Sequence, residues 1–109
     1  MRIWDISAKK LCRNHLLGEH RELHAIWSVI IYGKKGYSRH PETLRWVGKL
    51  KSLYARHEEL VTEMGRRGYK HKSPLDAKFA KGKSEQIEFV NSVKEQIIIL
   101  RGKKCDCKV

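Results

Sequence analysis

The chain has 109 residues, with 24 Lys or Arg against 12 Asp or Glu, which gives a formal net charge of +12. At 40% hydrophobic residues it can fill a single core, so it is not a disordered polyelectrolyte, and its length excludes a second core of useful size. No apolar run approaches the roughly 18 residues that a membrane span needs, and the first residues lack the apolar stretch of a secretion signal.

The first predicted helix runs from about Ser7 to Tyr32. Ser7 suits the N-cap, and Gly33 suits the left-handed residue that ends a helix. We expect Gly18, inside the helix, to permit the close approach of another backbone. Apolar side chains at near-helical spacing predict one buried stripe, formed by Leu11, His15, Leu16, Leu23, Ile26 and Ile30.

The second predicted helix runs from Pro41 to Arg67, because proline suits a first helical turn and Gly68 suits the stop. Its expected buried stripe comprises Leu44, Val47, Leu50, Tyr54, His57, Leu60, Val61 and Met64.

The third predicted helix runs from Ser84 to Arg101 and ends before Gly102. Its expected inner face comprises Ile87, Val90, Val93, Ile97 and Leu100. Flexible basic loops at 33–40 and 70–83 join the helices, and nothing predicts a strand pair. The sequence therefore predicts an all-α fold, a compact three-helix single domain over residues 1–109, with 100–109 as a flexible basic tail.

Metal binding finds only weak support in the sequence. Cys105 and Cys107 form a C-x-C with no second pair, and an odd cysteine count argues against a disulfide framework. His20 and His24 share a helix face, but H-x-E-x-H is not the zinc-protease pattern. We favour a reactive tail, a solvated polar face and a core position for Cys12, and therefore expect no metal.

His15 and Glu22 lie two turns apart, so they share a face of the first helix near Gly18. With Arg21 they can form a pocket for an anion or a reacting sugar. The alternative is an ion-paired helix surface, which is common.

The excess of positive charge favours an anionic partner, with nucleic acid first and an acidic membrane surface second. The basic residues concentrate in loops and at helix ends, which suits contact with phosphates. No helix-turn-helix or RNA-recognition pattern is present, so we do not expect base-sequence reading.

Two stretches of the chain resemble the phage-type pyrimidine-dimer DNA glycosylases, which are AP lyases of the endonuclease V-like repair group. The first comprises Met1-Arg2-Ile3 and the run from Asn14 to Leu23, with its H-L-x-x-E-x-R-E-L pattern. The second comprises positions along the second helix that end in Arg67-Gly68-Tyr69, followed by Lys72. The resemblance covers about residues 1–75.

The resemblance implies a helical repair enzyme that cuts the glycosidic bond of a pyrimidine dimer and then nicks the backbone by β-elimination. The α-amine of Met1 would be the nucleophile and would form an imine with the sugar C1′. Glu22 would move protons and stabilise the sugar cation. Cofactors are not expected, because imine chemistry uses only the amine. The expected DNA-binding residues are Arg2, His15, Arg21, Arg67 and Lys72.

An N-terminal amine has a physical advantage as a nucleophile. Its ordinary pKa is about 7.7–8, against about 10.4 for lysine, so at neutral pH it is roughly a few hundred times more often neutral. The apolar Ile3 and Trp4 predict that this end is packed rather than loose.

We expect a monomeric, cytoplasmic, nucleoid-associated protein whose partner is double-stranded DNA carrying a lesion or an abasic site, with no membrane partner. Two alternatives stay open. One is a glycosylase or lyase for another lesion, and the other is a non-enzymatic helical DNA-binding module.

Overall fold

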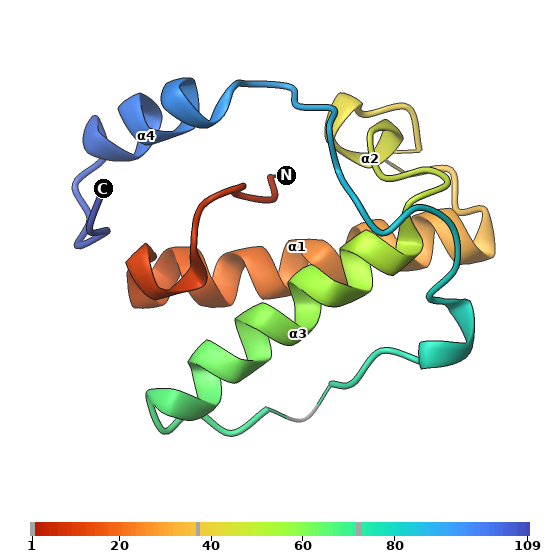
Figure 1. The fold of residues 1–109 in the computed structure, drawn as a ribbon, viewed down its shortest axis with the longest axis horizontal. Helices are drawn as coiled ribbons and strands as arrows, with labels where there is room; N and C mark the ends of the chain where they lie inside the picture. The colour runs from red at the N-terminus through yellow and green to blue at the C-terminus, as the bar shows by residue number, and fades with distance from the viewer. Residues whose placement is uncertain (1, 37, 72) are drawn as a thin grey trace.

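The computed structural model describes residues 2–36, 38–71 and 73–109. Within these residues the fold is all-helical, with four α-helices: α1 (Arg13–Tyr32), α2 (Pro41–Leu44), α3 (Leu50–Arg66) and α4 (Val93–Arg101). Two short 3-10 helices, η1 (Ala8–Lys10) and η2 (Ala77–Phe79), complete the order. Figure 1 shows α1 and α3 crossing, with the N-terminal segment running between α1 and α4. The expected all-α single domain is confirmed, although its helices differ from the prediction.

The first predicted helix begins later than expected. Residues 8–10 form η1, and α1 starts only at Arg13 with Cys12 as its N-cap. Its predicted end is confirmed, because Gly33 takes the left-handed conformation at φ 61°.

The second predicted helix is interrupted, which corrects the single span from Pro41 to Arg67. Gly48 has φ 78°, and α3 begins two residues later. Residues 81–83, distant in sequence, stabilise this interruption. Lys51 N donates to the carbonyl of Lys81, and Ser52 N donates to the carbonyl of Lys83. These bonds satisfy backbone donors in the first turn of α3 that have no partner inside the helix.

The third predicted helix is half as long as expected. Residues 84–92 are not helical, and α4 begins after Ser92. Ser92 and Glu95 form a capping box, in which each side chain accepts a bond from the other's backbone N–H. This local signal fixes the start of α4 more strongly than the apolar spacing did.

The core joins the inner faces of α1 and α3 to the N-terminal segment and to Leu100 of α4. Most of the predicted stripes on the first two helices are buried or partly buried. The exceptions are Leu44 and Val47 of the second predicted helix, which are exposed. On the third predicted helix, Ile87 and Val90 lie in the non-helical residues and are exposed, as is Val93, the first residue of α4.

No helix in the described part of the chain combines the length and apolar character needed to cross a bilayer.

Candidate active site

The N-terminal segment is held by side chains that accept hydrogen bonds from consecutive backbone amides. Arg2 N donates to Glu22 Oε2 at 2.6 Å, and Trp4 N donates to Glu19 Oε1 at 3.0 Å. Ile3 N donates to Glu42 Oε1 at 2.6 Å. Asp5 N continues the series by donating to Gln96 Oε1 at 2.7 Å. Because the acceptors come from α1, α2 and α4, the segment is fixed on three sides.

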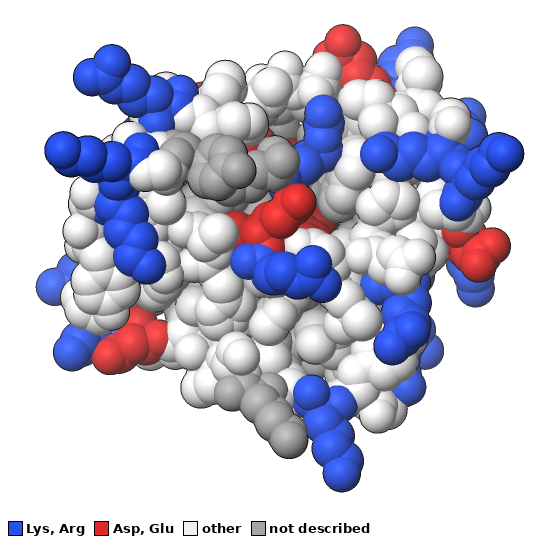
Figure 2. All heavy atoms as spheres, turned by 180° about the vertical axis from the view of Figure 1, so that it is seen from behind, with Lys and Arg blue, Asp and Glu red and all other residues white. Residues whose placement is uncertain are grey.

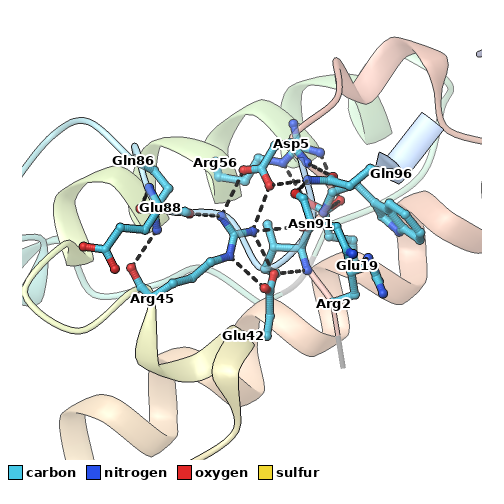
Figure 3. Close-up of polar contacts among 12 residues, drawn as sticks. Arg2, Asp5, Glu19, Glu42, Arg45, Arg56, Gln86, Glu88, Asn91 and Gln96 are labelled. Atoms are coloured by element: carbon cyan, nitrogen blue, oxygen red, sulfur yellow. Dashed lines mark hydrogen bonds and ion pairs between the residues drawn. The ribbon is translucent and has the colours of Figure 1, made fainter. Parts of the chain in front are cut away.

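Arg45 supports this arrangement by reaching between Glu42 and Asp5 (Figure 3). Its guanidinium is 5% exposed and pairs with Glu42 at 2.7 Å and with Asp5 at 3.0 Å. It also donates to the carbonyl of Ile3 at 3.0 Å. A buried cation between two carboxylates satisfies charges that would otherwise be costly to bury.

Glu22 opens onto a pocket of about 740 Å³ that is bounded by α1, the N-terminal segment, the start of α2 and residues just before and after α4. Gly18 and His15 line the same pocket, so the predicted grouping of His15 and Glu22 on one helix face is present. The lining residues are Arg2, Trp4, Asn14, His15, Gly18, Glu19, Glu22, His40, Pro41, Val90 and Lys103.

Gly18 has a different role from the expected one. A Cβ at this position would meet no atom within 4 Å, so no backbone approaches it closely. Its missing side chain instead leaves room in the pocket beside Glu22. The prediction of a close backbone approach at Gly18 is wrong, although the N-terminal segment does pack against α1.

His15 faces two sulfur atoms through its Nδ1 atom. That nitrogen lies 3.2 Å from Cys12 Sγ and 3.1 Å from Cys107 Sγ. Burial lowers the pKa of His15, and the nearby charge of Lys103 lowers it further. The imidazole is therefore neutral near pH 7.

Glu19 joins the N-terminal segment to α3. Its carboxylate receives two bonds from Arg56, at 2.6 and 3.0 Å, besides the one from Trp4 N. Burial raises the pKa of Glu19 to about 7, against the opposing charge and hydrogen bonds of Arg56. Glu19 therefore positions Trp4, next to the pocket, rather than standing open to a ligand.

Three other predicted site residues, all arginines, differ in their contacts and exposure. Arg2 donates to Asn91 Oδ1 at 3.0 Å and stacks 5.0 Å from the Trp4 ring centroid. Arg21 is exposed on α1, one position before Glu22. Arg67 pairs with Glu63 at 2.6 Å and donates to the carbonyl of Leu11 at 2.7 Å, so it joins α3 to the segment before α1.

The predictions for Met1 and Lys72 fall outside the described residues. The first described backbone nitrogen is Arg2 N, which belongs to the peptide bond between Met1 and Arg2. Figure 2, which views the molecule from behind, shows most Lys and Arg side chains around the edge of the view, and acidic side chains near its centre with basic ones beside them.

Two clusters of possible metal ligands correct the expectation of a solvated histidine face. One comprises Cys12, His15, Cys105 and Cys107, and the other comprises His20, His24, His57 and His71. Burial, together with the neighbouring imidazoles, lowers the pKa of His20 to about 4.

The last residues of the chain are also packed, since Lys108 N donates to the carbonyl of Lys10 at 2.7 Å.

Several residues that build the pocket were not identified from the sequence. Glu42, Glu19 and Gln96 hold the N-terminal amides, and Lys103 lines the pocket. Glu19 is a fixed position of the H-L-x-x-E-x-R-E-L pattern, and the only other sequence signal for the three acceptors is their polarity. That signal does not show which distant amide each side chain binds.

Comparison with known proteins adds one finding. A family model described as pyrimidine dimer DNA glycosylase matches residues 1–77, more than two thirds of the chain. No curated protein and no solved structure matches.

Proposed function

Because the chain belongs to the pyrimidine dimer DNA glycosylase family, we propose that it also cleaves the abasic site, with the Met1 amine as nucleophile and Glu22 as proton carrier. The observation that carries the proposal is the 2.6 Å bond from Arg2 N to Glu22 Oε2. Covalent geometry keeps the nitrogens of adjacent residues within about 4 Å of each other. We therefore expect the N-terminal amine, one residue earlier in the chain, to come within reach of the Glu22 carboxylate.

The reaction begins at the sugar C1′ of the lesion nucleotide. The neutral amine forms a bond to C1′ as the C1′–N bond to the base breaks, and the base leaves with the bonding electrons and takes up a proton. The Glu22 carboxylate stabilises the cationic character that develops on the sugar. Opening of the sugar ring at O4′ then gives the protonated imine.

Strand cleavage follows from the imine. Loss of a proton from C2′, with Glu22 as the acceptor, allows the C3′–O bond to break and the 3′ phosphate to leave. Water hydrolyses the remaining imine and restores the amine. Every step uses groups of this chain, water and DNA.

The pocket beside Glu22 suits an extruded nucleotide. Its volume of about 740 Å³ falls within the usual range for small-ligand sites. Arg2, His15 and Lys103 supply polar groups at its walls, and Trp4 supplies an aromatic face. An enzyme that acts on a base within a duplex must turn a nucleotide out of the stack, which needs a recess of this kind.

We expect Arg2, Arg21, Arg67 and Lys72 to contact phosphates of double-stranded DNA, and the protein to act as a monomer in the cytoplasm near the nucleoid. Positive charge outnumbers negative charge two to one in the sequence. Binding should therefore weaken steeply with rising salt, as counterion release requires.

Borohydride trapping tests the proposed chemistry. Protein with a free Met1 is incubated with duplexes that carry a cyclobutane dimer or an abasic site, with and without borohydride. We expect a covalent adduct that maps to residues 1–4 after cleavage before Asp5, a fragment that contains no lysine. Acetylation of the Met1 amine should remove the adduct but leave salt-dependent DNA binding.

Other outcomes would assign a different function. An adduct with abasic DNA but no release of dimers would favour a different lesion. DNA binding without any adduct or nicking would favour a non-enzymatic binding module. An adduct on a lysine side chain would contradict the role of the Met1 amine.

A further inference from the structure

Three thiols and one imidazole from the two ends of the chain meet beside the start of α1. His15 Nδ1 lies 3.2 Å from Cys12 Sγ and 3.1 Å from Cys107 Sγ. All four candidate donor atoms, with Cys105 Sγ as the fourth, lie within 4.8 Å of one another. His15 and Cys107 are 92 residues apart in sequence, so only the folded chain creates this group.

This donor set is one of the standard sets of structural zinc sites, which hold the ion in a tetrahedron of three cysteines and one histidine. Zinc bonds of about 2.3 Å to sulfur and about 2.0–2.1 Å to nitrogen place neighbouring donor atoms about 3.3–3.8 Å apart. The two nitrogen–sulfur distances are close to that range. A small shift of side chains would therefore complete the tetrahedron.

The surrounding backbone suits thiolate ligands. Cys12 is the N-cap of α1, where the helix dipole favours negative charge. Cys12 N donates to Cys107 Sγ at 3.1 Å, as backbone amides do when they support a metal-bound sulfur. The hydrogen bond from Lys108 N to the carbonyl of Lys10 holds the C-terminal segment beside Cys12 and the start of α1.

We propose that Cys12, His15, Cys105 and Cys107 bind one zinc ion, which fastens the C-terminal segment to the start of α1. Coordination through Nδ1 leaves Nε2 of His15 as the proton-bearing nitrogen, so the ion would fix the tautomer of a residue that lines the pocket. It would also hold Lys103, two residues before Cys105, at the pocket wall. Zinc content itself does not depend on the proposed reaction.

A second cluster carries an independent inference. His24 Nε2 and His57 Nε2 lie 3.1 Å apart, and the four imidazole donor atoms of the cluster lie within 4.8 Å of one another. Among the described residues, His20 Nε2 and His71 Nε2 are buried without a hydrogen-bond partner. A buried polar atom without a partner is costly, so two of them in one cluster point to a ligand.

We infer that His20, His24, His57 and His71 bind one divalent ion of the zinc, copper or nickel class, because imidazole suits these metals. The site would join α1 and α3 to the loop that follows α3. The carboxylate of Glu58 lies 3.3 Å from His57 Nδ1, on the far side of that ring. Carboxylates in this position orient metal-bound histidines.

Metal analysis tests both sites in the full chain. Protein produced with zinc and dialysed without chelator should contain two metal ions per chain, one for each cluster. The double variant Cys105→Ser and Cys107→Ser should contain one fewer, and His20→Asn should likewise contain one fewer. Asp106→Asn and His40→Asn, which alter neighbouring or similar residues outside the clusters, should retain both.

Cobalt and a mercurial reagent test the same sites in the unaltered sequence, so the proposal does not depend on a variant folding. Cobalt substitution should give a thiolate charge-transfer band, and mercurial modification of the thiols should release one zinc ion. Three free thiols with no bound metal, or a disulfide among the cysteines, would overturn the zinc site. Loss of all metal in the cysteine variant, despite native helicity, would overturn the histidine site.

Discussion

The N-terminal segment, residues 2–5, and the segment of residues 81–92 are both non-helical, but they are held in opposite ways. The first places four consecutive amides on side-chain acceptors and buries Ile3 and Trp4. The second makes backbone–backbone bonds near the start of α3 and accepts a bond from Arg45 at the Glu88 carbonyl, but it leaves Ile87 and Val90 exposed.

The difference shows that the polar side chains of this fold hold the N-terminal segment at every amide of residues 2–5. Chain termini are usually loosely held. Here each backbone amide of residues 2–5 is held by a side chain, and the proposed reaction at the Met1 amine would require such precise positioning. The segment of residues 81–92 satisfies the first turn of α3, contacts Arg45 through Gln86 and Glu88, and leads to α4.

The largest effect should come from Glu22→Gln. A glutamine oxygen can still accept the bond from Arg2 N, so the free energy of unfolding should change little. Strand cleavage of dimer-containing DNA should fall by about 10²–10⁴-fold, because the proton carrier is lost. Single-turnover assays measure this, with Glu85→Gln in the segment of residues 81–92 as the matched control. Unchanged cleavage would contradict the role of Glu22.

Arg45→Met should break the support common to both segments. It removes the cation that pairs with Asp5 and Glu42 and also donates to the carbonyl of Glu88. Leaving buried carboxylates without a partner should cost about 3–5 kcal/mol in the free energy of unfolding, measured by urea titration. Arg66→Met, at an exposed arginine, should cost under about 1 kcal/mol. Equal losses would show that burial does not determine the effect.

A matched pair of truncations compares the two segments directly. Ile3→Ala removes a side chain that is 1% exposed and should cost about 2–5 kcal/mol. Ile87→Ala removes one that is 75% exposed and should change stability by less than about 0.5 kcal/mol. Thermal or urea unfolding gives both values. A large loss from Ile87→Ala would reveal a covering contact on the second segment.

The smallest effect should appear in acid. Hydrogen bonds from Arg66, and then from Arg67, hold the pKa of Glu63 at about 2 against an ordinary value of 4.5. Because the folded pKa is the lower one, this stabilisation is present above about pH 4.5 and disappears as pH falls towards 2. The urea midpoint should therefore fall over that window by more in the native sequence than in Glu63→Gln. Parallel curves would contradict a paired Glu63.

Much of the fold was predictable because it depends on local signals. Gly33 and Gly68 end helices at positive φ, as the sequence indicated. The buried residues Leu16, Leu23 and Leu60 lie on the predicted stripes. Such features need only the few neighbouring residues that a helix turn contains.

The errors arise where distant residues decide the local structure. The carbonyls of Lys81 and Lys83 complete the start of α3, so a helix predicted to run through Gly48 divides there. The His20 face was expected to be solvated, but His57 and His71 cover it. Neither contact has a signature near the residue that it affects.

The sequence by itself determined the all-helical class, the family and the juxtaposition of His15 and Glu22, because helical periodicity places residues seven apart on one face. Only the tertiary structure decided that Glu22 binds the first described amide and that Cys12 and Cys107 meet. The physical reason is the separation in sequence between the residues that interact. Helix formation depends on bonds four residues apart, whereas the bonds to the amides of residues 2–5 and both metal-ligand clusters require segments that approach only when the core forms.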